Sequence, residues 1–393
     1  MISSLNIPDI FITSELNHED IRSFVNAEIT QCVSIFNPTI RDAVLSSLLA
    51  KSDGMFLWVK LMLVKAAPND HEVVNRLADL PSDLEKAYNL LLGRLSSKLD
   101  KHQLRLVHTL FTLTAASGRP LGMEELRYAY ALVTKPESDS TSSGLERFFL
   151  RLQPEEIVAH CGAILTFMGG VFRIVHNSAN DYLIRPVSEW VSVNDPQIHV
   201  LRVDPVKAHR ALCDLCLRYL SDVDCSQLRW EYAPSLESVG PQQPLIHYAC
   251  LYVAYHINRS QRSFSQLRGK ISSLIGSDQC FFVLEYLSPL TISEMSMDSR
   301  LEIWILFEKL SSDEAFGTEI IPSLVERWER EYSHRISTFG KKILLRNDGY
   351  LSAILLPHFC LWVTTRSVES SIPRSPSTPV LNRTTTGVVC NKT

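Results

Sequence analysis

The stretch from Gly169 to Leu183 constrains the fold of this chain more than any other part of the sequence. It reads GGVFRIVHNSANDYL: a glycine pair, a short apolar run that ends at His176, and a polar start to a new segment. Adjacent glycines between two apolar runs are typical of a hairpin turn. The runs 163–167 and 171–175 therefore predict a small β-hairpin, and the residues after His176 predict the start of a helix.

Three predicted helices precede this hairpin. They cover residues 101–116, 123–133 and 154–161, with a serine-rich loop at 136–144. Pro154 suits the first turn of the third helix, and the acidic Glu155 and Glu156 favour its positive end. Three helices followed by a hairpin is the order of a winged helix, so we expect a winged-helix domain over residues 101–190.

The rest of the chain is also predicted to be mainly α. Residues 1–97 are expected to form a helical subdomain, in which Asn17 caps the first helix, residues 40–50 form a second, and the nearly all-apolar residues 55–66 form a buried one. Pro81 ends one element, and either Ser82 or Asp83 can cap the next helix, which runs to about residue 95.

A further helical region of unknown type is expected over residues 205–350, and residues 366–393 are expected to be a disordered tail. The candidate helices of this region are 206–220, 244–257, 280–287, 301–310 and 321–332. The fold class is therefore mainly α, with one small hairpin.

Composition excludes several classes of protein. The 393 residues are 45% hydrophobic and 21% charged with a net charge of −4, so there is no global attraction to nucleic acid or anionic lipid. No apolar run is long enough to span a membrane and no basic segment followed by an apolar run opens the chain. Nine cysteines without a paired framework favour free thiols. We therefore expect an intracellular, cytoplasmic protein without membrane partners.

No enzymatic motif is present in the sequence. A phosphate-binding loop needs glycines that expose backbone N–H groups and a following lysine, and neither this pattern nor a dinucleotide-binding glycine motif occurs. A Gly-x-Ser-x-Gly esterase elbow is also missing. We therefore expect no catalytic residue, no enzymatic activity and no cofactor.

His209, Cys213 and Cys216 have a spacing that places them on one helical face. A tetrahedral zinc ion would need a fourth ligand, and Cys225 is the nearest candidate. The surrounding residues are apolar, and buried cysteines behave as small hydrophobic side chains. Buried structural thiols are the favoured interpretation, and no metal site is predicted.

DNA binding is the least favoured function. A winged helix often reads DNA with its third helix, which here spans 154–161 and carries two acids and no Lys or Arg. Because nonspecific affinity for DNA comes largely from Lys and Arg, the segment predicts no DNA binding.

His176 admits two interpretations. It can be an ordinary histidine at a strand end, with its ring bonded to a nearby backbone group. Alternatively, its ring N–H can donate to an oxygen of a nucleotide phosphate.

Several segments resemble fungal NACHT-type proteins, which belong to the signal-transduction ATPases that include NOD-like receptors. Residues 54–61 read GMFLWVKL, similar to the family's GMFLWAKL, and residues 80–88 resemble its LP-x-x-L-x-x-x-Y turn. The other resembling segments are 119–126 (RPLGMEEL), 174–183 (IVHNSANDYL), His209 with 216–220 (CLRYL) and 245–249 (LIHYA). The resemblance covers about residues 15–258, and its winged-helix part is the segment also named after GPI inositol-deacylase.

The resemblance implies a layout and a role. Residues to about 97 would be the end of a NACHT module with its helical subdomain, and 101–190 the winged helix. In the family the histidine that matches His176 can touch the phosphate of the bound nucleotide. Both Walker segments and the sensor strand are expected to lie upstream of Met1, so His176 would act only if a nucleotide-binding core were supplied by another polypeptide.

The function expected from the sequence is thus a non-catalytic protein-interaction or regulatory module, derived from a NACHT-type ATPase and truncated before its nucleotide core. Its expected partners are proteins, among them full-length NACHT proteins. The alternative is that the chain is a fragment of a larger nucleotide-binding NACHT switch.

Overall fold

A computed structural model describes residues 14–31, 38–63, 70–136, 142–190, 196–223, 243–261, 264–275, 277 and 279. The chain divides into two compact units, Met1–Gln266 and Leu267–Thr393. The elements discussed below belong to the first unit. Helix α14 (Phe264–Ile275) crosses the division and was not predicted. The predicted helices at 280–287, 301–310 and 321–332 and the predicted tail at 366–393 lie outside the described residues.

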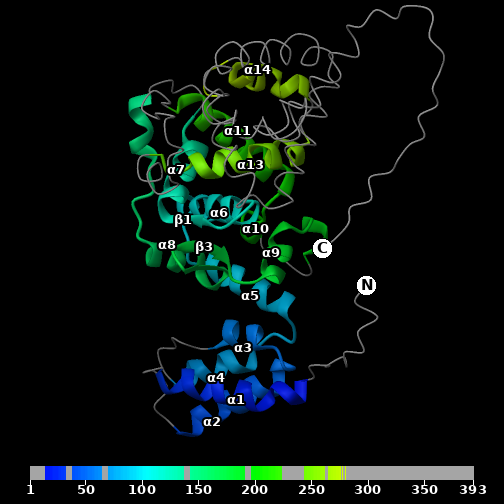
Figure 1. Ribbon diagram of the computed structural model, residues 1–393. Helices are drawn as coiled ribbons and strands as arrows, with labels where there is room; N and C mark the ends of the chain where they lie inside the picture. Colours follow the sequence, from blue (N-terminus) through cyan, green and yellow to red (C-terminus); the bar gives the residue numbers. More distant parts are fainter. Residues whose placement is uncertain are drawn as a thin grey trace, which may run out of the picture. The chain divides into compact units, whose positions relative to one another are not determined.

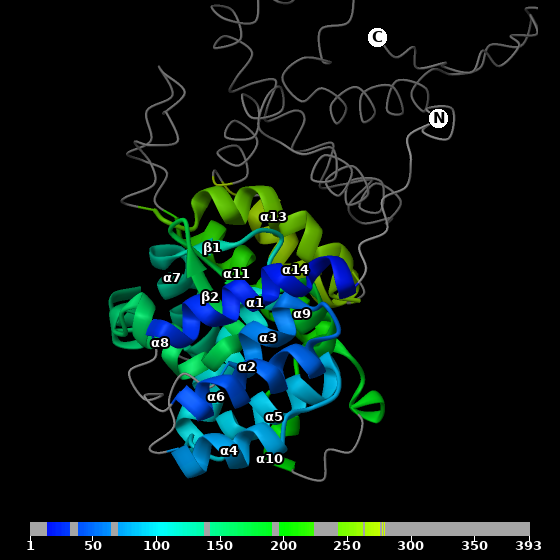
Figure 2. The ribbon, with the colours of Figure 1, turned by 90° about the horizontal axis from the view of Figure 1, so that it is seen from below.

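The first unit begins with four helices that lie beside one another, in blue, in both Figure 1 and Figure 2. They are α1 (Ser14–Gln31), α2 (Pro38–Ser52), α3 (Phe56–Met62) and α4 (Asp70–Ala78). Their apolar residues follow helical spacing and are buried: Ile21, Val25, Ile29, Val44, Leu48, Trp58 and Val59. Burial of these stripes against one another supplies the main free energy that holds the four helices together.

Several sequence predictions for this group were wrong. Asn17 does not cap α1, which begins at Ser14; its side-chain Nδ2 instead donates to Gly54 O at 3.1 Å. Helix α3 ends at Met62 and is not buried all round, because Phe56 is 40% exposed. Helix α4 was not predicted at all. Between α2 and α3 the chain turns at Asp53 and Gly54, whose φ values of 46° and 74° lie in the left-handed region.

Helix α5 (Leu84–Ser96) follows the Pro81 turn. Of the two candidate caps, Asp83 performs the role, since its carboxylate accepts from Lys86 N at 2.8 Å. This hydrogen bond is the largest cause of a lowered pKa of Asp83. The end of α5 agrees with the sequence prediction.

Three helices and a small sheet come next, as the sequence predicted. The helices are α6 (Lys101–Ala115), α7 (Met123–Thr134) and α8 (Pro154–Cys161). The hairpin strands β2 (Leu165–Met168) and β3 (Val171–Ile174) pair antiparallel, with Leu165 opposite Ile174 and Met168 opposite Val171. The turn needs its glycines, because Gly169 and Gly170 have φ values of 59° and 79°.

Three short elements of this region were missed by the sequence analysis. Strand β1 (Leu121–Gly122) pairs with β3, so the sheet has the order β1-β3-β2. A 3₁₀ helix, η1 (Ser142–Phe148), begins inside the predicted serine-rich loop, of which residues 137–141 lie outside the described part. Another short 3₁₀ segment, η2 (Gly162–Ile164), joins α8 to β2. A two-residue strand carries no recognisable alternation, which is why the pattern did not reveal it.

The remaining elements complete the first unit. Helix α9 (Asn177–Ile184) follows β3, and η3 (Val187–Glu189) and α10 (Pro196–His199) lead to the long helices α11 (Pro205–Asp222) and α13 (Ile246–Arg259). Helices α11 and α13 pack extensively on each other. Gly118, before β1, lies so close to α13 that a Cβ there would come 2.1 Å from Tyr252 Cδ1. None of the described helices could cross a membrane, for want of length and apolar character.

Candidate functional site

His176 lies where strand β3 gives way to helix α9. Its backbone is extended, with φ −162° and ψ 154°, and Val175 N donates to Ile164 O at 2.9 Å just before it. The ring caps α9, because Nδ1 accepts the backbone N–H of Ser178 at 3.1 Å. The ring is exposed. No described residue is hydrogen-bonded to Nε2, so this nitrogen faces solvent.

A line of hydroxyl groups connects the ring to helix α5. Ser178 Oγ lies 2.8 Å from His176 Nδ1 and 2.8 Å from the hydroxyl of Tyr88. Tyr88 is on α5 and is only 1% exposed. Burial raises the pKa of Tyr88, and nearby Asp181 raises it too, while the bond to Ser178 opposes this. The phenol is therefore protonated at neutral pH.

Further contacts hold α9 against α5. The hydroxyl of Tyr182 donates to Asn89 Oδ1, and the rings of Tyr182 and Tyr88 lie 5.4 Å apart. Arg185 at the end of α9 forms an ion pair with Glu85, at 3.2 Å. Trp190 stacks on Tyr182 at 4.9 Å and donates its Nε1–H to Tyr182 O at 3.1 Å. The position of His176 is thus fixed from two helices.

The sequence analysis named His176 but missed the residues that hold it. A serine two positions after a strand-ending histidine was a usable signal, because Ser and its neighbours at a helix start commonly take part in capping. Tyr88 ends the LP-x-x-L-x-x-x-Y segment, but no local signal connects it with Ser178, which lies 90 residues away. The backbone hydrogen bond expected of an ordinary histidine is present, and the phosphate-donor interpretation stays a prediction.

A second histidine cluster lies between α11 and α13. His209 Nδ1 is 3.0 Å from His256 Nδ1, and His256 Nε2 is 2.8 Å from the hydroxyl of Tyr248. His256 is 0% exposed. Burial lowers the pKa of His256 well below its ordinary value, and His209 and Arg259 lower it further. His256 is therefore neutral at physiological pH.

The cysteines near His209 are buried, as predicted. Cys213 and Cys216 are free thiols with 0% exposure, and burial raises the pKa of Cys216. Their neighbour on α13, Cys250, is also a buried free thiol. Among the described residues no three His, Cys, Asp or Glu side chains are arranged to hold a metal ion, and Cys225 lies outside them. Within that part of the chain His209 pairs with a histidine instead.

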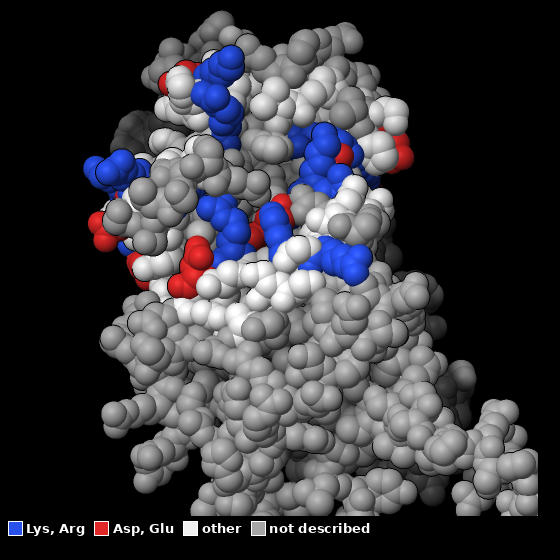
Figure 3. All heavy atoms as spheres, turned by 90° about the horizontal axis from the view of Figure 1, so that it is seen from above, with Lys and Arg blue, Asp and Glu red and all other residues white. Residues whose placement is uncertain are grey.

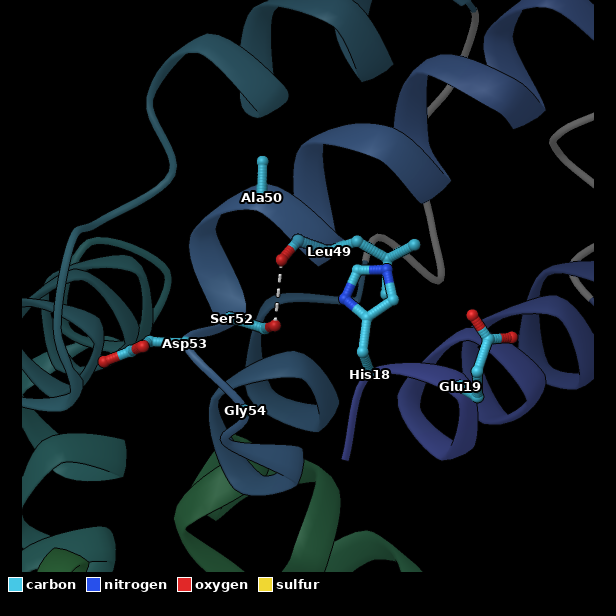
Figure 4. Close-up of a pocket in the computed structure, with 7 residues that line it drawn as sticks. All are labelled: His18, Glu19, Leu49, Ala50, Ser52, Asp53 and Gly54. Atoms are coloured by element: carbon cyan, nitrogen blue, oxygen red, sulfur yellow. Dashed lines mark hydrogen bonds between the residues drawn. The ribbon is translucent and has the colours of Figure 1, made fainter. Parts of the chain in front are cut away.

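Figure 4 shows an open pocket between α1 and the turn after α2. Its lining comprises His18, Glu19, Leu49, Ala50, Ser52, Asp53 and Gly54. Ser52 Oγ donates to Leu49 O at 3.0 Å, and His18 Nε2 lies 3.3 Å from an Arg22 nitrogen. Glu19 and Asp53 lie on opposite sides of the His18 ring in Figure 4, so they do not form a carboxylate pair. None of the residues around His176 lines this pocket.

The charge distribution gives no sign of a basic stripe on helix α8. Its Glu155 and Glu156 lie in the first turn, where Glu156 Oε2 accepts from Gln153 N at 2.7 Å. In the view of Figure 3, the described Lys and Arg side chains lie in separate groups, several of them beside Asp or Glu. The prediction that the chain does not bind DNA rests on these acids.

Comparison with known proteins gives one informative match. Over 212 residues the chain is 29% identical to the vegetative incompatibility protein HET-E-1 of Podospora anserina. The matched region amounts to 49% of this chain but to 15% of that protein's length. No protein-family profile matches the chain, and no solved structure matches it. Half of the chain is therefore similar to part of a much longer fungal incompatibility protein.

Proposed function

We propose that this chain is a non-catalytic regulatory module of a NACHT-type signalling protein, and that its winged-helix region closes over a nucleotide bound by a separate core. Similarity over half the chain to an incompatibility protein supports a signalling role. The order α6, α7, α8 and hairpin supports the winged helix. The core would be supplied by protein association, from the same polypeptide or from another.

The observation that carries this proposal is the placement of His176. Its ring sits at the start of α9 with one nitrogen bound to Ser178 and the other toward solvent. A ring N–H there can donate to a phosphate oxygen, and the positive end of the helix favours an anion. Bracing of α9 by α5 holds this donor at a fixed position.

The absence of catalysis is part of the proposal. The sequence contains no phosphate-binding loop and no esterase elbow. In the described residues, the pocket between α1 and α2 brings together neither paired carboxylates nor a nucleophile with its base. Binding and sensing, rather than turnover, fit these side chains.

Exposed apolar side chains offer contact points for a protein partner. Phe56 on α3 is 40% exposed and packs edge-on against Phe24 at 6.1 Å, and Met168 at the hairpin tip is 64% exposed. Neighbouring Trp58 is fully buried, so it belongs to the core and not to a contact surface. Phe56 and Met168 are accordingly the side chains to substitute when partner binding is tested.

The test is a titration of the full chain with fluorescent ADP and ATP analogues, alone and with a purified NACHT core that contains the phosphate-binding loop. We expect no binding by the chain alone and a stable ternary complex with the core. His176→Ala should weaken that complex about tenfold, the loss of about 1.4 kcal/mol typical of a hydrogen bond to a charged group. His160→Ala, a histidine on α8 outside the site, is the matched control. Tight stoichiometric binding by the chain alone would overturn the proposal.

A further inference from the structure

We infer that Ser178 and Tyr88 are positioning residues that keep the proton of neutral His176 on Nε2, so that the ring always presents a donor to its ligand. The inference deepens the proposed function and depends on it only for the identity of the ligand. The tautomer of the ring depends on contacts among His176, Ser178 and Tyr88. Both residues lie in segments that the sequence analysis compared with the family, 80–88 and 174–183, but neither was assigned a role there.

The first step concerns the backbone of Ser178. A backbone N–H can only donate, and it lies 3.1 Å from His176 Nδ1. A protonated Nδ1 would face this N–H hydrogen to hydrogen, so the contact favours the tautomer in which Nδ1 keeps its lone pair. A neutral imidazole carries its single proton on one of its two nitrogens. The remaining position for that proton is Nε2.

The second step fixes the direction of the hydroxyl line. With Nδ1 as acceptor, Ser178 O–H donates to it over 2.8 Å, and the serine oxygen is then free to accept from Tyr88 O–H, also over 2.8 Å. The Tyr88 hydroxyl has no other hydrogen-bond partner in the described part of the chain. A buried tyrosine normally satisfies its hydroxyl, and its raised pKa keeps it protonated, so it donates. The backbone N–H and the Ser178 hydroxyl thus share the single lone pair of Nδ1 in a three-centre hydrogen bond.

The consequence is chemical selectivity. An Nε2–H group offers a hydrogen to an acceptor and has no lone pair for a metal cation. The ligand class for this position is therefore a hydrogen-bond acceptor, and an anionic oxygen such as that of a phosphate makes the stronger bond. The opposite tautomer would present a lone pair to the phosphate, and the two would repel each other.

The two hydroxyl groups of Tyr88 and Ser178, here called the His176 relay, also make the tautomer of the ring depend on the position of helix α5. Tyr88 lies 90 positions before Ser178, and its contact depends on α5 staying packed on α9 through Tyr182 and Asn89. A displacement of α5 would remove the first donor of the relay. The Ser178 hydroxyl would then keep its contact with Nδ1 but lose the donor that orients it, so the position of α5 would influence the population of the Nε2–H tautomer.

The experiment is ¹⁵N NMR of the histidine rings in the full chain at about pH 8, where an ordinary imidazole is neutral. Two-bond proton–nitrogen spectra distinguish a protonated from a bare ring nitrogen. In the unaltered chain we expect His176 to be protonated on Nε2 and bare on Nδ1. Ser178→Ala should raise the population with the proton on Nδ1, Tyr88→Phe should raise it less, and Ser178→Thr, which keeps a hydroxyl, should restore the original spectrum.

His160 serves as the reference ring within each sample, because a general loss of structure would change it as well. A proton on Nδ1 of His176 in the unaltered chain overturns the inference, and that spectrum does not depend on whether any variant folds. Variants that fold but leave the His176 spectrum unchanged also overturn it.

Failure of this inference is separable from failure of the proposed function. If the ring has the expected tautomer but no nucleotide complex forms with the NACHT core, the proposed function fails and the inference about the ring stands. If the complex forms while Nδ1 carries the proton, the inference about the ring fails and the proposed function stands. With both intact, Tyr88→Phe should weaken the nucleotide complex by a smaller factor than His176→Ala.

Discussion

Two histidine clusters in the first unit use the same ring in opposite ways. Around His176 the ring bonds to its helix through one nitrogen and leaves the other exposed. Around His256 both nitrogens are taken, by His209 and Tyr248, and no surface is exposed. The difference shows that an unpartnered nitrogen, and not the presence of a histidine, distinguishes a place where a ligand can bind from a place that holds helices together.

The largest effect expected from this contrast is on stability. His256→Ala removes a buried ring and leaves the facing polar atoms of Tyr248 and His209 with fewer partners, so it should lower the free energy of unfolding by about 2–4 kcal/mol. His176→Ala removes only a cap from α9 and should cost about 1 kcal/mol. Chemical denaturation of both variants checks the comparison. Equal losses would contradict it.

The second effect is a pH dependence that arises from two histidines. One is His256 of the closed cluster, formed by His209, His256 and Tyr248, and the other is His108 on α6, whose Nε2 lies 3.1 Å from Arg202 O. Burial lowers the pKa of His256 and of His108 in the folded chain. Both therefore take up protons first in the unfolded chain, so stability is full above about pH 6.5 and falls as the pH drops below it. Each group contributes a slope of at most about 1.4 kcal/mol per pH unit. Denaturation midpoints measured between neutral and mildly acidic pH test this, and His256→Gln should flatten the curve.

A third and smaller effect concerns the open cluster, which consists of His176, Ser178, Tyr88 and Tyr182. Tyr182→Phe removes the hydroxyl that bonds to Asn89 but keeps the rings stacked with Tyr88 and Trp190. The expected loss of stability is about 1 kcal/mol, typical of a single hydrogen bond. Tyr130→Phe, at a tyrosine of α7 outside both clusters, is the matched control in thermal unfolding. A loss as large as that of His256→Ala would mean that this cluster, too, is mainly structural.

The smallest expected effect is on DNA. The chain should not bind duplex DNA, because the acids at the start of α8 repel a phosphate backbone. We expect no shift of labelled duplex at moderate ionic strength. A shift that weakens with added salt would revive the DNA-binding interpretation. Glu155→Lys with Glu156→Lys would then be expected to strengthen it.

Sequence signals that act within a few residues predicted helix α8 and the β2–β3 hairpin. Pro154 with its following acids gave the limits of α8 correctly, and the glycine pair gave the hairpin. Asn17 failed as a cap because its amide is used by a tertiary contact to Gly54, which no local pattern contains. Long-range geometry set this limit on the prediction.

The same reasoning applies to the two histidines. His176 was found because its signal is local, a histidine between a strand and a helix. The contacts made by Tyr88 and His256 were not predicted, because these residues lie 90 and 47 positions from their partners. Spacing within one helix placed His209 beside two cysteines, whereas the packing of α11 on α13 gave it another histidine. A chain of polar contacts between helices requires the fold before it can be recognised.

The close approach of Gly118 to α13 means that a substitution at this glycine would affect the closed cluster selectively. Even one methyl group there would overlap the ring of Tyr252, and the same loop donates Gly118 N–H to Tyr248, the partner of His256. Any side chain at position 118 would therefore clash with α13 unless Tyr252 moves. We expect Gly118→Ala to disturb the packing of this loop on α13 and, through Tyr248, the closed cluster. The contacts of His176 do not involve residue 118, so the substitution should affect one cluster and not the other.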